Sequence, residues 1–415
     1  MTLVSYQDRA LCMDGVDLAK VAGKIGTPCY VYSAASIVKN FQAYDQGFGD
    51  LPHTVCYAVK AAGNLAILRL LAQAGAGFDI VSGGELFRVL KAGGDPAKTV
   101  FSGVGKTAEE IDAALTAGVG FFNCESEPEL ELLDALAHRR AKQVRVALRV
   151  NPNVDAITHA YISTGSLKHK FGVDIGEAEA VYCRARRLEN LLLEGVSCHI
   201  GSQLLDPAPL IEAVDRVLDL IERLRADGFH IRHADFGGGL AVAYKPEDVA
   251  PDIGAFVKTL RSRVEGRGLH VRIEPGRSIV GSAGVLLTRV LYRKKTGDKE
   301  FVIVDAAMND LIRPALYSAY HEILPLRKAD NKNLRADVVG PVCETGDFLA
   351  RDRELPDLFP GDVLAVCTAG AYGFAQASNY NARPRSPEVL VEDLKWRIIR
   401  KRESYEDLIR GEEQA

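Results

Sequence analysis

Short apolar runs of strand type alternate with helical segments through the first two thirds of the chain. Each run is four to seven residues long. The strand candidates are residues 27–32, 55–61, 77–81, 99–102, 120–123, 144–150, 195–200, 231–236 and 269–273. This alternation is typical of parallel strands that are connected by helices.

The starts of several expected helices are also visible. Three have the spacing of a capping box, in which two side chains three residues apart bond each other's backbone N–H groups. These pairs are Ser82 with Glu85, Thr107 with Glu110 and Ser126 with Glu129. A helix over residues 34–47 is expected after the cap residue Ser33, and another over 64–74 is expected to stop at Gly75.

The number of strands favours a closed barrel. About eight strands over roughly 250 residues predict a (β/α)8 barrel of the TIM type, with residues 27–282 as its domain. An open, doubly wound sheet is the alternative. We favour the barrel because chemically notable residues follow nearly every strand, whereas an open sheet binds its ligand at one crevice.

From about residue 283 the pattern changes to β-branched runs separated by turns. The runs are residues 285–291, 301–304, 336–342, 363–367 and 396–399, and residues 360–362 have the composition of a turn. We therefore expect a second, β-rich domain, a sandwich or Greek-key barrel, formed by residues 1–26 and 283–415 and completing the active site.

Charge and hydrophobicity exclude several classes of protein. The 415 residues have a formal net charge of -4 and are 47% hydrophobic, which gives no basic excess for binding nucleic acid. No stretch is apolar over the length of a membrane span, and the first residues lack a signal-peptide pattern, so we expect a cytoplasmic protein. The eight cysteines are scattered singly, so neither a zinc site nor a disulfide framework is expected.

Lys60 is the first candidate for a catalytic residue, because it lies at the end of the apolar run 55–61. A lysine at the end of a buried strand must find an anion, lose its proton or become covalently attached to another group. The C-terminal ends of barrel strands are also where barrel enzymes place their chemistry.

Three further features follow predicted barrel strands. They are His199 with Ser202, the triplet Gly237, Gly238 and Gly239, and Glu274 with Gly276 and Arg277. Consecutive glycines let backbone N–H groups approach a phosphate, and a tight turn is the other interpretation. Glu274 forms either an ordinary ion pair with Arg277 or a bond that keeps a pyridine nitrogen protonated, as in pyridoxal phosphate enzymes. His199 is either a core histidine or a ring that stacks on a flat cofactor, and Ser202 either donates to an anion or caps a helix.

The β-rich region contains candidates for substrate binding. Arg313 and Tyr317 are four residues apart, so on one helical turn they would share a face and bind a carboxylate; a solvated arginine is the alternative. Cys343 precedes Glu344, and an adjacent acid keeps a thiol protonated, which suits a proton donor; a core cysteine is the alternative. Tyr372 lies in a glycine-flanked loop that permits close approach to a ligand.

In sequence order, these motifs resemble those of the pyridoxal-phosphate-dependent diaminopimelate decarboxylases, a family with an alanine-racemase-like barrel. The matching segments are Tyr57-Ala58-Val59-Lys60-Ala61, Val81-Ser82-Gly83-Gly84-Glu85-Leu86, His199-Ile200-Gly201-Ser202-Gln203, the glycine triplet, Glu274-Pro275-Gly276-Arg277-Ser278, Asn309-Asp310-Leu311-Ile312-Arg313-Pro314 and Cys343-Glu344-Thr345-Gly346-Asp347. Each segment alone is a weak signal, but the complete set, spread over nearly the whole chain, is specific. The sequence departs from the family pattern at Ala307 and Thr345, and neither is a reacting group.

The resemblance implies the cofactor pyridoxal 5'-phosphate and a role for each candidate. It implies that Lys60 forms a Schiff base with the cofactor aldehyde, that His199 stacks on the ring and that Glu274 pairs with the pyridine nitrogen. Phosphate contacts are implied for Ser202, Gly237, Gly238, Gly239, Gly276 and Arg277. Substrate contacts are implied for Arg277, Arg313, Tyr317, Glu344 and Tyr372, with Tyr372 near the cofactor as well.

The resemblance further implies a homodimer with active sites at the subunit boundary. Cys343 and Glu344 would reach into the site of the other subunit, where Cys343 would return a proton to the substrate carbon. The implied reaction converts meso-2,6-diaminopimelate to L-lysine and CO2, the last step of lysine biosynthesis. The alternatives are a decarboxylase of the same fold acting on ornithine, arginine or a carrier-tethered amino acid, and a non-catalytic homologue.

One charged stretch has no assigned role. Residues 151–171 contain His159, Lys168, His169 and Lys170. These charges could steer an anionic substrate, or the stretch could move as a lid, and a solvated loop is the other interpretation.

Overall fold

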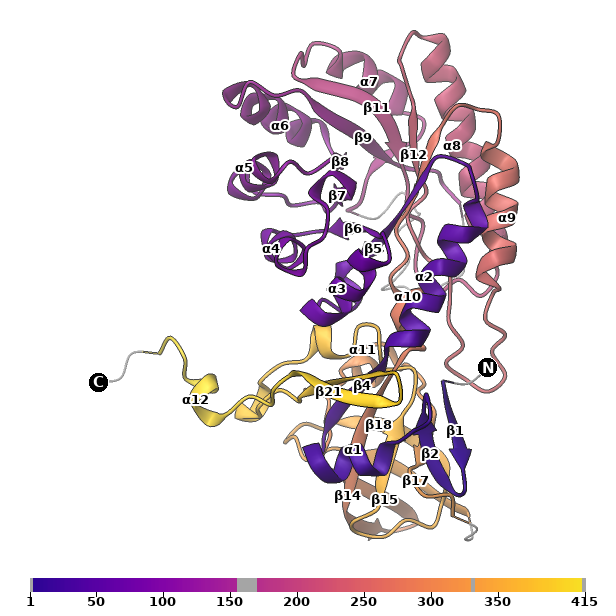
Figure 1. Cartoon of the computed structure of the whole chain (residues 1–415), viewed down its shortest axis with the longest axis vertical. Helices are drawn as coiled ribbons and strands as arrows, with labels where there is room; N and C mark the ends of the chain where they lie inside the picture. Colours follow the sequence, from indigo (N-terminus) through magenta and orange to yellow (C-terminus); the bar gives the residue numbers. More distant parts are fainter. Residues whose placement is uncertain (1–2, 155–169, 330–332, 413–415) are drawn as a thin grey trace. The chain divides into compact units, whose positions relative to one another are not determined.

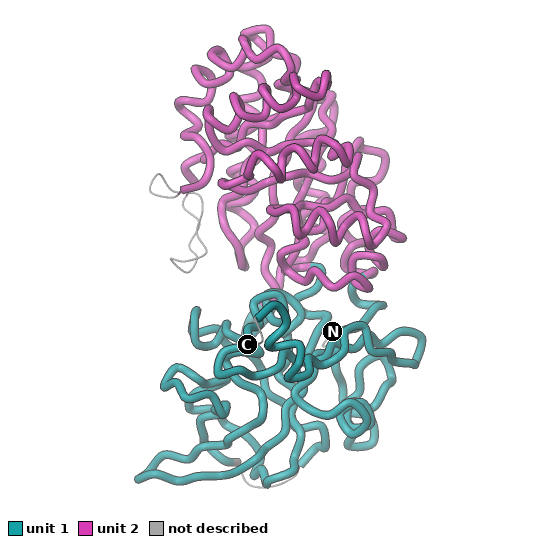
Figure 2. The backbone as a smooth tube through the Cα atoms, turned by 90° about the vertical axis from the view of Figure 1, so that its left-hand side faces the viewer, with its two compact units in different colours: residues 1–37, 243–248, 279–415 teal, residues 38–242, 249–278 magenta. Residues whose placement is uncertain are grey.

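The computed structural model describes residues 3–154, 170–329 and 333–412. The chain divides into two compact units, which Figure 2 shows in different colours. We call residues 38–242 and 249–278 the barrel unit, and residues 1–37, 243–248 and 279–415 the β unit. Each unit is described by itself.

In the described part of the barrel unit, eight parallel strands form a closed barrel. The strands are β5 (His53–Ala58), β6 (Gly77–Ile80), β7 (Thr99–Phe101), β8 (Phe121–Cys124), β9 (Val144–Asn151), β11 (Leu191–Ser197), β12 (His233–Asp235) and β13 (His270–Ile273). They are hydrogen-bonded in the order β9-β11-β12-β13-β5-β6-β7-β8, and pairing of β8 with β9 closes the ring. The predicted closed barrel is therefore confirmed over the open sheet. A short strand β10 (Val173–Asp174) extends β9.

Helices surround the barrel strands, as Figure 1 shows. They are α2 (Ala34–Phe48), α3 (Leu65–Gln73), α4 (Gly83–Ala92), α5 (Ala108–Ala117), α6 (Glu127–Arg139), α7 (Ala178–Ala185), α8 (Ala208–Ala226) and α9 (Ile253–Val264). Each turns apolar residues toward the strands; α8, for example, buries Leu210, Val214, Val217 and Ile221 at helical spacing. A small apolar cluster of Cys56, Val100, Phe121 and Ala147 joins four of the barrel strands.

One of the three predicted capping boxes is complete. Thr107 and Glu110 bond each other's backbone at the start of α5. Ser82 accepts from Glu85 N at the start of α4, but the Glu85 carboxylate bonds Val81 N, one residue before the cap. The box predicted at Ser126 is wrong: this described serine makes no capping bond.

The reason for the difference at Ser126 is a competing partner for the carboxylate three residues later. Glu129 accepts from Glu125 N and from Lys106 Nζ, so its two oxygens are used outside the predicted box. Glu85 and Glu129 therefore both accept from the backbone N–H of the residue just before the helix cap, Val81 and Glu125 respectively. Each of these N–H groups lies just after a barrel strand.

The described β unit contains two sheets. The small one has β1 (Val4–Gln7), β2 (Ala10–Met13) and β3 (Val16–Asp17), and the helix α1 (Leu18–Ile25) follows. The large one has β18 (Phe348–Pro356), β17 (Asn333–Val339), β15 (Lys299–Val304), β14 (Gly284–Thr296), β4 (Cys29–Ser33), β20 (Glu388–Glu392) and β21 (Lys395–Arg400) in that order. A further strand, β19 (Val363–Val366), pairs with β14, and β16 (Ile323–Pro325) pairs with β19. The described chain also has three short α-helices, α10 (Arg277–Val280), α11 (Arg313–Tyr317) and α12 (Tyr405–Leu408), and four single 3-10 turns.

Strand β4 lies in a different sheet from the one expected. The run 27–32 was assigned to the barrel, but β4 pairs antiparallel with β14 and parallel with β20. All five of its residues are buried. A short, wholly buried run carries no alternation that could show which sheet it enters. Residues 243–248 also group with the β unit, although they lie between barrel segments in the sequence.

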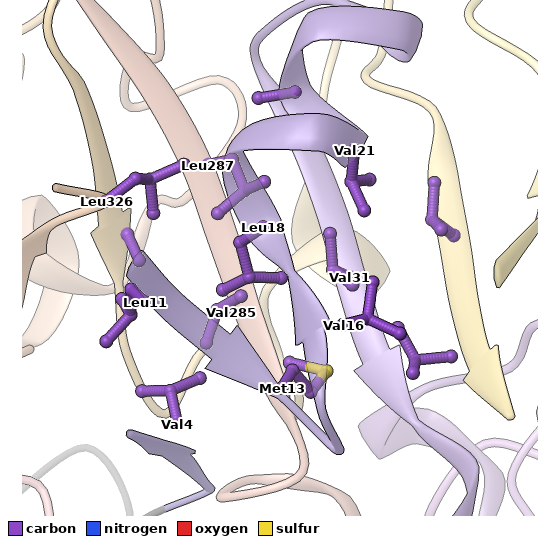
Figure 3. Packing of buried hydrophobic residues seen from close by; sticks show 14 of the residues in the cluster. Val4, Leu11, Met13, Val16, Leu18, Val21, Val31, Val285, Leu287 and Leu326 are labelled. Atoms are coloured by element: carbon purple, nitrogen blue, oxygen red, sulfur yellow. The ribbon is translucent and has the colours of Figure 1, made fainter. Parts of the chain in front are cut away.

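The N-terminal elements and the large sheet share one hydrophobic core, as Figure 3 shows. Leu11, Met13 and Leu18 pack with Val31 of β4 and with Leu287 of β14. Burying a side chain of this size contributes about 1.5–3 kcal/mol. The shared core therefore stabilises the packing of the N-terminal elements against the strands of the large sheet. Among the described helices, none combines the length and the apolar composition needed to span a bilayer.

Candidate active site

Lys60 follows strand β5 on a single 3-10 turn, Val59–Ala61, and its ammonium group has an acidic partner. Lys60 Nζ donates to Asp79 Oδ2 at 2.5 Å. Asp79 lies on β6 and its side chain is fully buried, while the Lys60 side chain is 40% exposed. An anion was one of the three outcomes expected for a lysine at the end of a buried strand, and the neighbouring strand supplies one.

Glu274 lies one residue beyond β13 among other polar groups from four strand ends. Its Oε1 accepts from Ser102 Oγ and from Asn123 Nδ2, both at 3.1 Å. Asn123 Nδ2 also lies 3.1 Å from Asp235 Oδ2. Burial, and then the negative charges of Asp235 and Asp79, raise the pKa of Glu274 well above its usual value.

These buried carboxylates make the site favourable for a cation or a proton donor. Burial also raises the pKa of Asp235, which accepts from Gly237 N at 2.9 Å. A positively charged N–H group beside Glu274 and Asp235 would relieve the cost of burying two anions close together. The arrangement therefore suits the protonated nitrogen of a pyridine ring better than a neutral ring.

His199 is a neutral ring at the end of β11. Its Nδ1 accepts from Gly238 N at 3.2 Å, which leaves the second ring nitrogen to carry the proton. Burial, and then the charges of Arg149 and Lys60, lower the pKa of His199 to about 3. An uncharged flat ring held in one orientation can stack against another flat ring.

The glycine triplet leaves space that no other residue type would leave. A Cβ atom at Gly238 would lie 2.4 Å from Glu274 O, and one at Gly237 would lie 2.6 Å from Cys198 O. Gly237 and Gly239 also have φ values of 62° and 123°, where side chains are strained. The backbone can therefore approach a phosphate closely here.

The segment after β13 is packed against the Lys60 turn. A Cβ atom at Gly276 would lie 3.0 Å from Ala58 Cβ and 3.1 Å from Ala61 Cβ. Arg277, the next residue, donates from Nη2 to Ser202 Oγ at 3.1 Å. Gly276 thus allows the chain to pass close to the lysine, and Arg277 joins Ser202 to the same end of the barrel.

A cavity of about 300 Å³ lies among these residues, lined by Lys60, His199 and Glu274 with Ser102, Asn123 and Arg149. Four buried atoms of the described residues nearby have no hydrogen-bond partner: Asp79 Oδ1, Asn123 Oδ1, Arg149 Nε and Ser197 Oγ. Unpartnered buried polar atoms are rare in proteins and indicate a place for a polar ligand. An aldehyde-bearing pyridine ring with a phosphate fits the lysine, the carboxylates and the glycine turn.

The remaining predicted residues belong to the β unit. Arg313 and Tyr317 lie on the single turn of α11, as predicted, and Arg313 is 6% exposed. Tyr372 has a φ of 54°, which is strained for an aromatic residue and is found mainly where a ligand or function requires it. Cys343 and Glu344 are both exposed. Most of residues 151–171, including His159, Lys168 and His169, lies outside the described residues.

Several polar residues of the site were not identified from the sequence. They are Asp79, Ser102, Asn123, Arg149 and Asp235, and each lies within the last three residues of a barrel strand or just beyond it. The signal available for each was a single polar residue within or at the end of an apolar run, and Lys60 carries the same signal. In the described chain no cluster of His, Cys, Asp and Glu is arranged to hold a metal ion.

The family model for the pyridoxal binding domain of pyridoxal-dependent decarboxylases matches residues 34–281. The chain belongs to this family. As a pyridoxal-dependent decarboxylase it is an enzyme, and its cofactor is pyridoxal 5'-phosphate, as predicted from the sequence. The matched residues include the complete barrel with its lysine, its glycine turn and Glu274.

Individual pyridoxal-dependent decarboxylases are similar over nearly the whole chain. The diaminopimelate decarboxylase of Pseudomonas aeruginosa is 54% identical over 412 residues, which cover 99% of each protein. A crystal structure of diaminopimelate decarboxylase from Helicobacter pylori, complexed with L-lysine, has a TM-score of 0.91 at 44% identity and covers 95% of this chain and 98% of that one. The corresponding enzyme of M. jannaschii, in co-complex with L-lysine, has a TM-score of 0.94 at 38% identity and covers 99% and 98%.

Proposed function

We propose that this protein converts meso-2,6-diaminopimelate to L-lysine and CO2, the last step of lysine biosynthesis. The proposal rests on the cavity in which Lys60 lies with a neutral histidine, buried carboxylates and a glycine turn. The substrate is proposed from relatives that carry the name diaminopimelate decarboxylase at high identity over their full length, two of which are described with bound L-lysine.

The barrel unit is proposed to hold the cofactor. Lys60 binds the aldehyde, His199 stacks on the ring, and Glu274 holds a proton at the pyridine nitrogen. Ser202, Arg277, Gly276 and the turn of Gly237, Gly238 and Gly239 bind the phosphate. When bound, pyridoxal phosphate supplies a ring that accepts the electron pair left behind as CO2 departs.

The β unit is proposed to supply the groups that recognise the rest of the substrate. Together with Arg277 of the barrel unit, Arg313 and Tyr317 contact carboxylates, and Glu344 binds the amine of the far end. Tyr372 lies near both the cofactor and the substrate. A substrate whose far end carries both an amine and a carboxylate satisfies this pair of opposite charges, whereas ornithine leaves the arginine without a carboxylate there.

Cys343 is proposed to return a proton to the substrate carbon after CO2 leaves. In this proposal the enzyme is a homodimer, and Cys343 and Glu344 act in the site of the other subunit. Their exposure in a single chain is what residues serving a second subunit require. We also propose a cytoplasmic enzyme, which agrees with eight cysteines that are all free thiols.

The decisive experiment measures CO2 release by the holoenzyme from diaminopimelate, ornithine, arginine and lysine. We expect release from diaminopimelate alone, with L-lysine as product. A higher kcat/KM on ornithine or arginine would establish the alternative decarboxylase, and no release from any of the four substrates would contradict the proposal. Lys60→Ala is the matched control, because it should remove both turnover and the visible absorbance of the lysine-bound cofactor. A coloured, borohydride-reducible Lys60→Ala protein would contradict the role of Lys60.

A further inference from the structure

We infer that His321 is a positioning residue that sets the affinity of the enzyme for the carboxylate at the far end of the substrate, acting through Arg313. The inference rests on the role proposed above for Arg313. His321 is fully buried and lies four residues beyond α11, in the segment that leads to β16. It matched none of the motifs that identified the candidate site.

The hydrogen bonds of His321 have a definite direction. Arg313 Nη1 lies 2.7 Å from His321 Nε2, and His321 Nδ1 lies 2.8 Å from Cys367 O. A guanidinium group has only donors, and a backbone carbonyl is only an acceptor. His321 Nε2 therefore accepts from Arg313, and Nδ1–H donates to Cys367 O. The imidazole must be neutral, in the tautomer with its proton on Nδ1.

An aromatic ring also supports the arginine. The guanidinium carbon of Arg313 lies 4.4 Å from the centre of the Tyr244 ring. The Tyr244 and His321 rings are 5.2 Å apart and meet edge to face at 80°. Tyr244 belongs to residues 243–248, the short segment that joins the β unit from between two barrel segments. The arginine is thus held by an imidazole nitrogen and by the face of an aromatic ring.

The chemistry of these two supports suits a carboxylate-binding arginine. An aspartate or glutamate in the place of His321 would also orient Arg313, but it would neutralise the guanidinium charge. A neutral imidazole and an aromatic face orient the group without cancelling that charge. Because the side chain is ordered in advance, substrate binding need not remove its rotational freedom.

Two substitutions separate the bond to Arg313 from the bond to Cys367. In His321→Asn, the amide N–H occupies the place of Nδ1–H and can still donate to Cys367 O, but the side chain is too short to reach Arg313. In His321→Gln, the amide oxygen reaches the place of Nε2 and can accept from Arg313. Both variants keep a polar side chain in the buried site, so both should fold.

The test compares two ligands that differ only in the carboxylate. L-lysine keeps the carboxylate of the far end, and 1,5-diaminopentane lacks it. Inhibition constants for both are measured with the holoenzyme, together with KM and kcat for diaminopimelate. We expect His321→Asn to weaken lysine binding and raise KM about tenfold, the effect of a charge-assisted hydrogen bond. Binding of 1,5-diaminopentane, kcat and the visible absorbance of the cofactor should change less than about twofold, and His321→Gln should restore most of the lysine affinity.

Two further variants show whether the loss seen in His321→Asn is specific to the bond with Arg313. Arg313→Ala should show the same selective loss, and a larger one, whereas His270→Gln, a barrel histidine bonded to Thr54 Oγ1, should show none. Equal weakening of both ligands in His321→Asn, or no weakening of either, overturns the inference. If Arg313→Ala lacks the selective loss, the proposed role of Arg313 itself fails. If only Arg313→Ala shows it, the role of Arg313 stands and the role of His321 is refuted.

Discussion

Lys60 Nζ and Asp79 Oδ2 lie 2.5 Å apart, at the ends of two neighbouring strands of the barrel. Asp79 is fully buried, and one of its oxygens has no partner among the described residues. The pair places the amine of the lysine at one edge of the cavity that holds Glu274 and His199. The carboxylate thus holds the amine of the lysine in one position at the edge of this cavity.

Asp79→Asn should lower kcat about tenfold or more while KM changes little. The substitution keeps the shape of the side chain but removes a charge-assisted hydrogen bond, which contributes about 1.5–3 kcal/mol. Steady-state kinetics of the holoenzyme would measure the effect. Asp112→Asn, which breaks an exposed pair with Arg140, is the control and should leave kcat unchanged. Wild-type turnover in Asp79→Asn would show that the pair has no part in the reaction.

Lys106→Met should weaken cofactor binding about tenfold, although Lys106 does not line the cavity. Lys106 Nζ donates to Gly103 O and Asn123 O, both at 2.8 Å, and to Glu129 Oε1 at 2.5 Å. Lys106 therefore fixes the backbone of Asn123 and of Gly103, the residue after Ser102. The side chains of Ser102 and Asn123 are the two donors to Glu274. Equilibrium titration of the apoprotein with pyridoxal phosphate measures the loss. Lys142→Met, which removes a similar lysine bond to Leu115 O, is the matched control.

Loss of Lys106 should also destabilise the fold, because it leaves the nearly buried carboxylate of Glu129 without its cation, at a cost of about 3–5 kcal/mol. The double variant Lys106→Met/Glu129→Leu should recover most of the melting temperature without recovering the cofactor affinity. If cofactor affinity returned together with stability, the lysine would act only on the fold and not on Glu274.

Gly238→Ala should disrupt the proposed phosphate site. The added Cβ would lie 2.4 Å from Glu274 O, a backbone atom that cannot move aside cheaply. We expect cofactor affinity to fall at least about tenfold and stability to fall by about 1–3 kcal/mol from overpacking. Cofactor titration and thermal unfolding measure the two effects. Gly105→Ala is the control, since no atom lies within 4 Å of its added Cβ. A normal cofactor affinity in Gly238→Ala would rule out close backbone approach.

Cys343→Ala should slow turnover about a hundredfold, the usual contribution of a positioned general acid, and leave cofactor binding intact. The measurement is kcat with a parallel spectrum of the bound cofactor. Cys183→Ala is the matched control and should leave kcat unchanged. Cys183 is the other exposed cysteine of the described residues and lies on α7. Near wild-type turnover in Cys343→Ala would exclude it as the proton donor.

Glu85→Gln should change how stability depends on pH. Burial raises the pKa of Glu85 from 4.5 to about 7, and its Oε2 accepts from Val81 N. Between these two pH values the folded protein holds a proton that the unfolded chain has lost. Wild-type stability contributed by this group is therefore complete below about pH 4.5 and is lost as the pH rises through 7, by at most about 1.4 kcal/mol per pH unit.

Urea unfolding of wild type and Glu85→Gln from pH 4.5 to 8 measures this dependence, and the variant should lose less stability over that range. For Glu110 the stability contribution depends on pH in the opposite direction, so Glu110→Gln serves as the comparison. Backbone N–H groups of Gly83 and Thr107 lower the pKa of Glu110, so its contribution is lost only as the pH falls below the usual range. Parallel pH profiles for wild type and Glu85→Gln would show that Glu85 titrates normally.

Local signals in the sequence were sufficient for the barrel and for the main residues of the site. The alternation of strand and helix, the helix starts at Asn64 and Thr107, and the glycine triplet each follow from the conformational preferences of a few neighbouring residues. Lys60 was identifiable because a charge that ends an apolar run needs a chemical reason. These features depend on the chain within one strand or one turn, so the order of residues alone determined them.

The sheet that β4 joins and the partners of Glu274 were decided only by the tertiary structure. Glu274 bonds Ser102 and Asn123, which are 172 and 151 residues away, and Arg313 is supported by Tyr244 and His321 from separate segments. The failed cap at Ser126 has the same cause, since Glu129 found Lys106 instead. Buried polar groups must be paired, and which groups meet depends on the closed barrel and the packed sheets rather than on neighbours in the sequence.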